Sequence, residues 1–449
     1  MMSLAEAAAV LGGRASSAEL RFGGVSTDSR RIERGDLFVA LRGERFDGHE
    51  FLAAAAAAGA AAALIDRRYA GPAPLPAVTV EDSRRALGEL ARHWRARYSP
   101  ALIAVTGSNG KTTVKEMLAA ILRSHAGEDA VLATAGNLNN DIGLPLTLLR
   151  LRHAHRWCAI ELGMNHRGEI AHLAAIARPT VALVNNAQRE HLEFMRSVEE
   201  VATENASVYG ALPDDGMAVV NADDPQAALF RRAAGARRVL DFGLEANAAL
   251  GASVKPAALT SELRLRLPDG EAHATLAIAG RHNVMNALAA AACAHAAGIP
   301  AAAIGSGLSA FRPYTGRLQV KRAAGGATVI DDSYNANPDS VRAAIDVLAA
   351  CPAPTALVLG DMGEVGEQGA EFHREVGTYA SAKQITRLYA LGDATRHAVE
   401  AFGAGARHFD SVESLVASIE GQSILVKGSR FMKMERVVSA LTGNGTGGH

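Results

Sequence analysis

The 449-residue sequence has only three cysteines, Cys158, Cys293 and Cys351, and they lie far apart. So few cysteines exclude a disulfide framework, and their spacing is not that of a zinc site. An excess of one charge is also missing, because 46 lysines and arginines face 47 aspartates and glutamates. This balance does not favour a polyanion such as DNA as the main partner, and leaves room only for a local basic pocket. We expect a reducing, cytoplasmic location and no nucleic-acid partner.

Long apolar runs are missing as well. The first residues, MMSLAEAAAVLGG, contain no basic segment that leads into a long apolar core, so no signal peptide is expected. The alanine-rich run at 51–65 is interrupted by Gly59, and no run approaches the ~18 residues of a membrane helix. The hydrophobic share of 49% and the charged share of 21% are those of a globular protein. We therefore expect no integral membrane segment.

The chain is too long for one ordinary core, since domains usually contain ~100–200 residues. Composition and periodicity predict three segments, with strands and helices alternating in each and a small antiparallel patch near 239–280. These are an N-terminal segment (1–82), a central segment (83–313) and a C-terminal segment (314–449). Strands are expected near 101–105, 159–162, 181–184 and 217–220 in the central segment, and near 328–330, 356–359, 388–390 and 424–426 in the C-terminal one. The alternation predicts an α/β protein of three domains, with a doubly wound central sheet.

The sharpest motif is VTGSNGKTT at 105–113, between a predicted strand and a predicted helix. Backbone N–H groups of such a loop wrap phosphate oxygens, and the helix N-terminus adds positive potential. Glycines allow close approach, the lysine supplies a cation and the first threonine offers a hydroxyl to Mg²⁺. The loop is shorter than usual, because Val105 stands where the first glycine is expected; the alternative is a plain strand–helix turn. The candidate nucleotide-binding residues are Gly107, Ser108, Asn109, Gly110, Lys111, Thr112 and Thr113.

Two further strands of the central segment end in polar residues. Glu161 ends one of them, and the other leads through NNAQRE to His191. Ligands of open α/β sheets bind beyond the C-terminal strand ends, where a carboxylate suits Mg²⁺ and a histidine suits a second metal, a phosphate or a carboxylate. The alternatives are a strand-end salt bridge for Glu161 and an ordinary loop histidine for His191.

Asparagines gather at two places. Asn137 and Asn139 lie in TAGNLNN at 134–140 and can donate amide N–H groups to anionic groups of a substrate. Asn283 and Asn286 lie three residues apart at the start of a predicted helix, hence on one face, and amides suit the edge of adenine. The alternatives are an asparagine-rich turn at the first place and helix capping by Asn283 at the second.

Taken in order, these motifs resemble the Mur ligase family over almost the whole chain. The resemblance rests on STDSR at 26–30 with LFVALRGERFDGHEF, TGSNGKTT, GNLNNDIGLP, GRHNVMNA, and a C-terminal set: TGR at 315–317, DDSYNANP at 331–338, LGDMGE at 359–364 and VKGSR at 426–430. It implies an N-terminal domain that holds a uridine nucleotide, a central domain that binds MgATP, and a C-terminal domain that brings the amine substrate.

The resemblance also implies roles for individual residues. Ser29 and Arg30 would contact the uridine nucleotide. Arg317 and Asp332 would reach the phosphate and the ribose of ATP. Asn335, Asn337 and Lys427 would place the incoming dipeptide or active-site phosphates. The implied catalytic residues are Lys111, Glu161, His191 and Arg317, with Thr112 and Glu161 on one metal ion and His191 on a second.

The DDSYNANP block resembles family members that add D-alanyl-D-alanine to UDP-N-acetylmuramoyl-tripeptide, through an acyl phosphate, in peptidoglycan synthesis. Members that add the third residue typically carry Asp-Tyr-Ala-His-Thr-Pro there and an Asp-Asn-Pro-Arg motif, which this chain lacks. The expected cofactors are ATP and Mg²⁺, and the expected form is a monomer. The alternatives are another Mur-like ligase, which would add a diamino acid or extend folate with glutamate, a P-loop ATPase without ligase activity, and a nucleotide-binding regulator.

One departure from the family concerns a lysine. Many members carry a carbamylated lysine shortly after the region of His191, where it bridges to a metal. No lysine occurs here between Lys115 and Lys255. The hypothesis is that Asn205, Glu204 or water takes its place.

Overall fold

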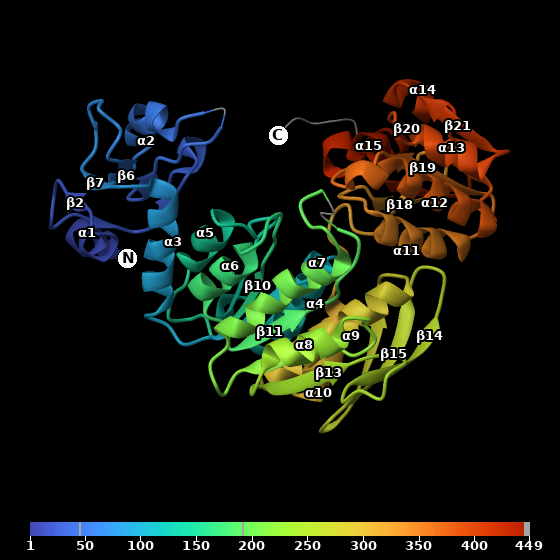
Figure 1. Ribbon diagram of the computed structural model, residues 1–449, viewed down its shortest axis with the longest axis horizontal. Coiled ribbons are helices and arrows are strands. Elements are labelled where there is room, and N and C mark those ends of the chain that lie inside the picture. The colour runs from blue at the N-terminus through green and yellow to red at the C-terminus, as the bar shows by residue number, and fades with distance from the viewer. Residues whose placement is uncertain (45, 191–192, 444–449) are drawn as a thin grey trace. The chain divides into compact units, whose positions relative to one another are not determined.

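A computed structural model describes residues 1–44, 46–190 and 193–443 of the chain. These residues form two compact units. Figure 1 colours the ribbon by residue number and labels its elements. The first unit contains Met1–Ala104, Glu128–Met164 and Gly168–Thr180, and the second contains the remaining described residues. Among the described residues, no helix combines the length and apolar character that a bilayer-spanning helix needs.

The first unit begins with a five-stranded sheet in the order β2-β7-β6-β5-β4, in which only β2 is antiparallel to its neighbour. Alternate residues of its strands pack with α2 around a small core that contains Phe38, Leu52 and Ile65. The elements are α1 (Leu4–Leu11), β2 (Arg14–Ala15), β4 (Val25–Ser26), β5 (Leu37–Val39), α2 (Leu52–Ala57), β6 (Ala62–Asp66) and β7 (Ala77–Val80), with β1 (Met2–Ser3) and β3 (Arg21–Phe22) as a separate antiparallel pair.

Helix α3 (Ser83–Arg95) follows this sheet, and Asp82 caps its N-terminus. The carboxylate of Asp82 accepts hydrogen bonds from the backbone N–H groups of Arg84 and Arg85 at 2.8 and 3.0 Å. Such a cap satisfies amide groups that have no partner inside the helix. The helix packs against α5 and α6 in the same unit.

The rest of the first unit is the β8-β10-β9 part of a parallel sheet. Strand β8 (Ala101–Thr106) runs from the first unit, which holds residues 101–104, into the second. The other elements here are β9 (Val131–Ala133), α5 (Gly143–Leu148), β10 (Trp157–Glu161) and α6 (Glu169–Ala177).

In the second unit, the same sheet continues from the end of β8 through β11, β12 and β13. Strand β12 pairs in parallel with both β11 and β13. Helix α4, which opens after β8, packs against α9 and α10. The elements are α4 (Lys111–Ala126), β11 (Val181–Val184), α7 (Val198–Ala206), β12 (Met217–Asn221), α8 (Ala227–Ala234), β13 (Arg238–Phe242), α9 (Arg281–Ala296) and α10 (Ala301–Ala310).

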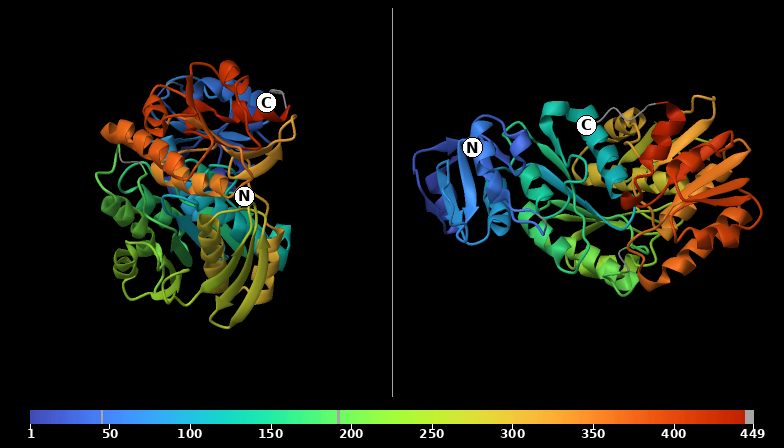
Figure 2. Two further views of the ribbon diagram at one scale, coloured as in Figure 1. Left: turned by 90° about the vertical axis from the view of Figure 1, so that its right-hand side faces the viewer. Right: turned by 90° about the horizontal axis from the view of Figure 1, so that it is seen from above.

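The expected antiparallel patch is confirmed as a three-stranded sheet of β14 (Gly251–Pro256), β15 (Ser261–Leu267) and β16 (Gly270–Leu276). In β15 each buried residue alternates with an exposed one, because one face of the sheet packs on protein and the other meets water. Figure 2 shows these yellow strands beside the helices, where α9 contacts β15 and α10 contacts β16.

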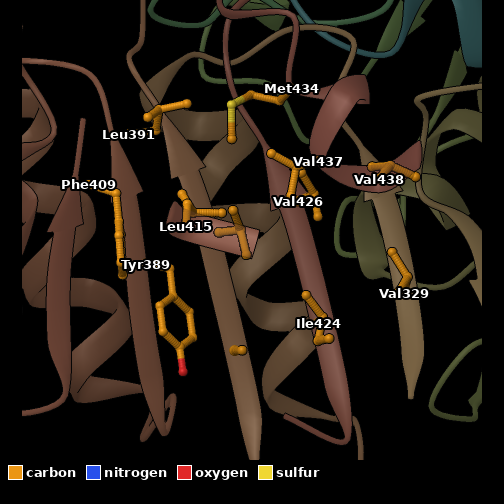
Figure 3. Packing of buried hydrophobic residues seen from close by; sticks show 12 residues of the cluster. Val329, Tyr389, Leu391, Phe409, Leu415, Ile424, Val426, Met434, Val437 and Val438 are labelled. Atoms are coloured by element: carbon orange, nitrogen blue, oxygen red, sulfur yellow. The ribbon is translucent and has the colours of Figure 1, made fainter. Parts of the chain in front are cut away.

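The C-terminal segment folds around a six-stranded sheet in the order β17-β18-β22-β19-β20-β21, parallel except for β17. One face carries a core in which Val329, Val358 and Val426 meet residues of α14 and α15, as Figure 3 shows around Val426. The other face packs against α11. The elements are β17 (Gln319–Arg322), β18 (Thr328–Asp332), α11 (Pro338–Ala349), β19 (Thr355–Gly360), α12 (Gly369–Ala382), β20 (Arg387–Leu391), α13 (Arg396–Phe402), β21 (Ala406–Phe409), α14 (Val412–Val416), β22 (Ser423–Lys427) and α15 (Glu435–Thr442).

Candidate active site

The expected phosphate loop connects β8 to α4, as the motif predicts. Gly110 has a φ of +82°, a left-handed conformation that suits glycine. A side chain at this position would place its Cβ 2.3 Å from Asn286 Oδ1 and 2.8 Å from Asn185 Nδ2. The loop therefore needs glycine both for its backbone conformation and because two amide side chains pass directly against it.

Lys111 lies over its own loop. Its Nζ donates to the carbonyl oxygens of Gly107 and Ser108 at 2.6 and 2.9 Å, and it is 3.3 Å from Glu190 Oε2. These contacts hold a cation above the backbone groups that would wrap a phosphate. The next residue, Thr112, is nearly buried at 8% exposure.

The connection after β11 packs directly on the loop. The side chain of Asn186 accepts from Asn109 N at 2.8 Å through Oδ1 and donates to Asn109 O at 3.0 Å through Nδ2. Asn185 donates to the same carbonyl at 2.8 Å. Sequence reasoning followed this stretch only as the path to His191. The two asparagines directly after a strand were the signal for a functional contact, because parallel strand ends meet at one edge.

The segment after β11 is also tied to the C-terminal segment. Arg189 forms ion pairs with Asp339 on α11 and Glu375 on α12, each at 2.6 Å, and Arg342 also pairs with Glu375 at 2.8 Å. Hydrogen bonds from Arg189 are the main reason that the pKa of Glu375 is lowered, and Glu375 and Asp339 in turn raise the pKa of Arg189. These pairs hold the connection beside Lys111 in place.

A pocket of about 390 Å³ lies within the second unit, between the phosphate loop, the end of β12, the start of α9 and the C-terminal segment. It has the size of a small-molecule site. Eight of the residues predicted from the sequence line it: Asn109, Gly110, Thr113, Asn283, Asn286, Arg317, Asp332 and Lys427.

Arg317 reaches the phosphate loop from the C-terminal segment. Its Nη2 donates to Thr112 Oγ1 at 3.3 Å, and its guanidinium carbon lies 4.2 Å from the ring centroid of Tyr334. Its Nε is buried and has no hydrogen-bond partner among the described residues. An unpaired donor on a cation beside a phosphate loop fits an anionic ligand.

Asp332 and Lys427 form a buried pair at the ends of adjacent strands, with Lys427 Nζ donating to Asp332 Oδ2 at 2.6 Å. Lys427 also donates to the carbonyl oxygen of Asn335 at 2.9 Å, and the backbone N–H of Leu318 donates to Asp332 Oδ1 at 3.2 Å. Asp332, which is predicted to contact the ribose of ATP, therefore already accepts two hydrogen bonds from the protein, and it still lines the pocket.

Asn337 connects helix α11 to the phosphate loop. Its Oδ1 caps the helix by accepting from Ser340 N at 2.9 Å, and its Nδ2 donates to Asn109 Oδ1 at 2.9 Å. The structure therefore brings Asn337 to the phosphate loop, while its contact with the incoming dipeptide stays a prediction.

Asn283 and Asn286 lie on the first turns of α9 and are nearly buried. The helix begins with Gly280 as its N-cap and without a side-chain cap, so the alternative of capping by Asn283 is wrong. Asn286 Nδ2 donates to Asn283 Oδ1 at 3.1 Å. Their placement on one face is confirmed, while contact with adenine stays a prediction.

Glu161 ends β10 in the first unit, with 2% of its surface exposed. Asn139 Nδ2 donates to its Oε1 at 2.7 Å. Its Oε2 is buried and has no hydrogen-bond partner among the described residues. Asn137 lies exposed in the same turn, where its carbonyl oxygen accepts from Asn139 N at 2.8 Å. A buried carboxylate oxygen without a donor fits a cation as its ligand.

Ser29 and Arg30 lie in a short 3-10 helix of the first unit, Ser29–Arg31. The Nε and Nη2 of Arg30 donate to Oδ1 and Oδ2 of Asp28, each at 2.9 Å, and this hydrogen bonding lowers the pKa of Asp28 to about 2. Arg30 is otherwise exposed. Its contact with a nucleotide stays a prediction.

The predicted second metal ligand, His191, lies outside the described residues. Among the residues that are described, no group of three or more histidine, cysteine, aspartate or glutamate side chains is arranged to hold a metal. Asn205, a candidate substitute for the family's lysine, is fully buried and accepts from Thr106 Oγ1 at 2.7 Å at the end of β8. Glu204 precedes it in α7 and is almost buried.

The fold and this loop define a P-loop α/β protein, and comparison with known proteins gives its family. Three family models match: Mur ligase family, catalytic domain at residues 21–95; Mur ligase middle domain at 105–294; and Mur ligase, glutamate ligase domain at 316–430. The UDP-N-acetylmuramoyl-tripeptide–D-alanyl-D-alanine ligase of Escherichia coli K12 is 41% identical, with 99% of each chain covered.

Two solved structures are similar as well. MurF from Acinetobacter baumannii has a TM-score of 0.91 at 33% identity, covering 98% of each chain. MurF ligase from Thermotoga maritima in complex with ADP has a TM-score of 0.81 at 27% identity, covering 94% of this chain and 97% of that one. The chain belongs to the Mur ligase family.

Proposed function

We propose that the protein is an ATP-dependent ligase that joins D-alanyl-D-alanine to UDP-N-acetylmuramoyl-tripeptide. The observation that carries the proposal is the pocket that Asn109, Gly110 and Thr113 of the phosphate-loop motif line together with Arg317 of the C-terminal segment. The name of the Escherichia coli relative, which matches over nearly the full length of both chains, supports this choice of substrates.

The chemistry explains why the phosphate loop carries a lysine and a second cation, Arg317, reaches it. A carboxylate is a poor acyl donor, so the terminal phosphoryl group of ATP is first transferred to the tripeptide carboxylate, which releases ADP. The amine of D-alanyl-D-alanine then attacks the acyl phosphate, and the tetrahedral intermediate expels inorganic phosphate as the amide forms. In phosphoryl transfer the protein acts mainly by positioning the groups and neutralising charge.

Lys111 and Arg317 would both neutralise negative charge on the phosphates of ATP. Lys111 would exchange the carbonyl oxygens of its own loop for the phosphates of ATP. Arg317 would approach them from the C-terminal segment with the Nε that has no partner among the described residues. Asp332 would bind the ribose of ATP. The incoming dipeptide or the active-site phosphates would be placed by Lys427, Asn335 and Asn337. Ser29 and Arg30 would hold the uridine nucleotide.

A magnesium ion fits the donors that the chain offers. Glu161 has a buried oxygen without a donor, and Thr112 provides a hydroxyl at the start of α4. Oxygen donors of this kind suit Mg²⁺. The ion would neutralise charge on the phosphates, and His191 would serve a second metal.

The missing lysine gives a prediction about carbon dioxide. Because no lysine lies between Lys115 and Lys255, a carbamylated lysine cannot form in this stretch. We expect ligase activity to persist when CO₂ is rigorously removed from the buffers, with Asn205, Glu204 or water beside the metal instead. The measurement is phosphate release in CO₂-free buffer with and without added bicarbonate, and recovery only with bicarbonate would contradict it.

The substrates can be tested directly. We expect phosphate release from ATP to require both UDP-N-acetylmuramoyl-tripeptide and D-alanyl-D-alanine, and mass spectrometry to find the pentapeptide product. A ligase that adds a diamino acid would instead turn over with the dipeptide nucleotide and the diamino acid. ATP hydrolysis that is indifferent to any acceptor would identify a plain P-loop ATPase and refute the proposal.

A further inference from the structure

A row of hydrogen bonds starts at the N-terminus of α9. The Nδ2 of Asn283 donates to the carbonyl oxygen of Ala279 at 2.7 Å and lies 3.0 Å from His282 Nε2. The Nδ2 of Asn286 in turn donates to Asn283 Oδ1 at 3.1 Å. His282 itself is partly buried and lines the pocket.

The same row ends on the phosphate loop. The Nδ2 of Asn185 donates to Asn286 Oδ1 at 3.0 Å and to the carbonyl oxygen of Asn109 at 2.8 Å. Gly110 lies against the Asn185–Asn286 contact, since a Cβ there would meet both amide groups. We call Asn283, Asn286 and Asn185 the amide chain. It connects residues up to 101 positions apart.

The direction of the amide chain is fixed at both ends. A carbonyl oxygen can only accept, so the atoms that face Ala279 O and Asn109 O must both be amide nitrogens. If either amide were rotated, two oxygens would face each other at about the distances now seen for hydrogen bonds. With this direction, the nitrogen of Asn283 also faces His282, so Nε2 of His282 has to accept. The imidazole must therefore be neutral, with its proton on Nδ1.

The charges around His282 agree with a neutral ring. Burial lowers its pKa to about 4, and Lys427 adds to this effect. Asp332 and Asp346 oppose it without reversing it. The ring therefore remains an acceptor across the neutral range, because a pKa below the ordinary value means that protonation occurs only at lower pH.

We propose that His282 is a positioning residue for the phosphate loop: its Nε2 accepts at one end of the amide chain, and the chain holds Asn109 and Gly110 in the conformation that binds the ATP phosphates. The inference rests on the proposed function for the identity of the nucleotide. Its physical basis is that an amide donor left without a partner in a buried site is costly, so the chain would rearrange when the acceptor is lost.

Two variants separate the acceptor from the volume of the ring. His282→Gln places an amide oxygen the same number of bonds from the backbone as Nε2, whereas His282→Leu has no acceptor. We expect His282→Leu to raise the Kd for MgADP about tenfold, and His282→Gln to stay within about threefold of the unchanged protein, since losing one partner of a buried hydrogen bond has an effect of this order. Isothermal titration calorimetry on the full chain measures both values without peptide substrates.

Turnover gives a second measurement. In His282→Leu the KM for ATP should rise with the Kd. The KM for D-alanyl-D-alanine should stay unchanged, because the amide chain ends on the phosphate loop at Asn109 and not on Asn335, Asn337 or Lys427, which are proposed to place the dipeptide. Equal binding by both variants and the unchanged protein, or equal losses in both variants, would overturn the inference. In the second case the ring's shape rather than its acceptor would matter.

The tautomer tests the inference even if His282→Leu does not fold. In ¹⁵N-histidine-labelled unchanged protein, with His282→Gln used to assign the signal, we expect Nε2 of His282 to lack a proton at pH 7.5. A protonated Nε2 would rule out the proposed direction of the chain. If MgADP binding responds to His282 as expected but no dipeptide is ever joined, the proposed function fails while the positioning role stands.

Discussion

Replacing Lys111 by alanine should lower phosphate release in the complete ligase reaction by at least ~10²-fold, the scale seen when one preorganised charge-stabilising group is removed. The reason is local. Its Nζ lies over the loop, held by the carbonyl oxygens of Gly107 and Ser108, so it is already placed where charge would build up on the phosphates. The measurement is kcat with saturating ATP and both peptide substrates.

The matched control for this variant is Lys255→Ala. Lys255 belongs to the same unit, but its side chain is 81% exposed and pairs only weakly across a strand with Glu262 at 3.4 Å. Exposed pairs of this kind contribute little to stability, so turnover should not change. Near-normal turnover of Lys111→Ala, with the control also normal, would remove Lys111 from the mechanism. Equal thermal unfolding of both variants would show that the fold is intact.

Features that depend on a few neighbouring residues could be predicted from the sequence. The strands β8 and β11 and the turn into α4 all follow from local patterns of apolar residues and glycines, and the structure confirms them. Strands of only a few residues, such as β9 (Val131–Ala133), were missed. Such strands are too short to show an alternation of apolar and polar residues, and their conformation is stabilised by pairing with a neighbouring strand, as β9 pairs with β10.

For residues far apart in the sequence, the patterns predict that they lie at the same edge of a sheet, but not which of them form hydrogen bonds with each other. The sequence places Arg317, Asn337 and Lys111 in motifs, but the hydrogen bond of Asn337 to Asn109 joins residues 228 positions apart. No spacing rule specifies such a partner. Asn185 and Asn186 lie directly after β11, which marks them as residues of the sheet edge, but their partner Asn109 cannot be read from the sequence.

The three predicted segments and the compact units describe different properties of the chain. The segments follow changes of pattern along the sequence, whereas the units follow packing. Strand β8 belongs to both units, so packing divides the central segment through one of its strands. The predicted boundaries at 82 and 313 therefore stay predictions about folding domains. The boundary at 313 lies in the gap between two matching family models, whereas the boundary at 82 lies within the model that matches residues 21–95.

Arg317→Ala should separate activity from stability. Its Nε has no hydrogen-bond partner among the described residues, and its contact with Thr112 Oγ1 is long at 3.3 Å. The side chain therefore adds to folding mainly through its stacking on Tyr334, worth about 0.5–1 kcal/mol for an arginine over an aromatic ring. We expect the melting temperature to fall by only a few degrees, while kcat falls by ~10²-fold because a cation is lost from the phosphates.

Two further variants test whether the guanidinium of Arg317, rather than its charge alone or any surface arginine, is responsible for the loss of kcat. Arg317→Lys keeps the charge but loses the planar fork, so it should recover only part of the lost kcat. Arg322→Ala removes an exposed arginine from β17 of the same C-terminal segment, where its side chain donates to Gly326 O and Thr328 Oγ1, and it should leave kcat unchanged. A kcat for Arg317→Ala equal to that of Arg322→Ala would show that the guanidinium does not act on the phosphates. A loss of kcat that merely follows the unfolded fraction would show that Arg317 supports the fold instead, and the unpaired Nε would then have no role in the reaction.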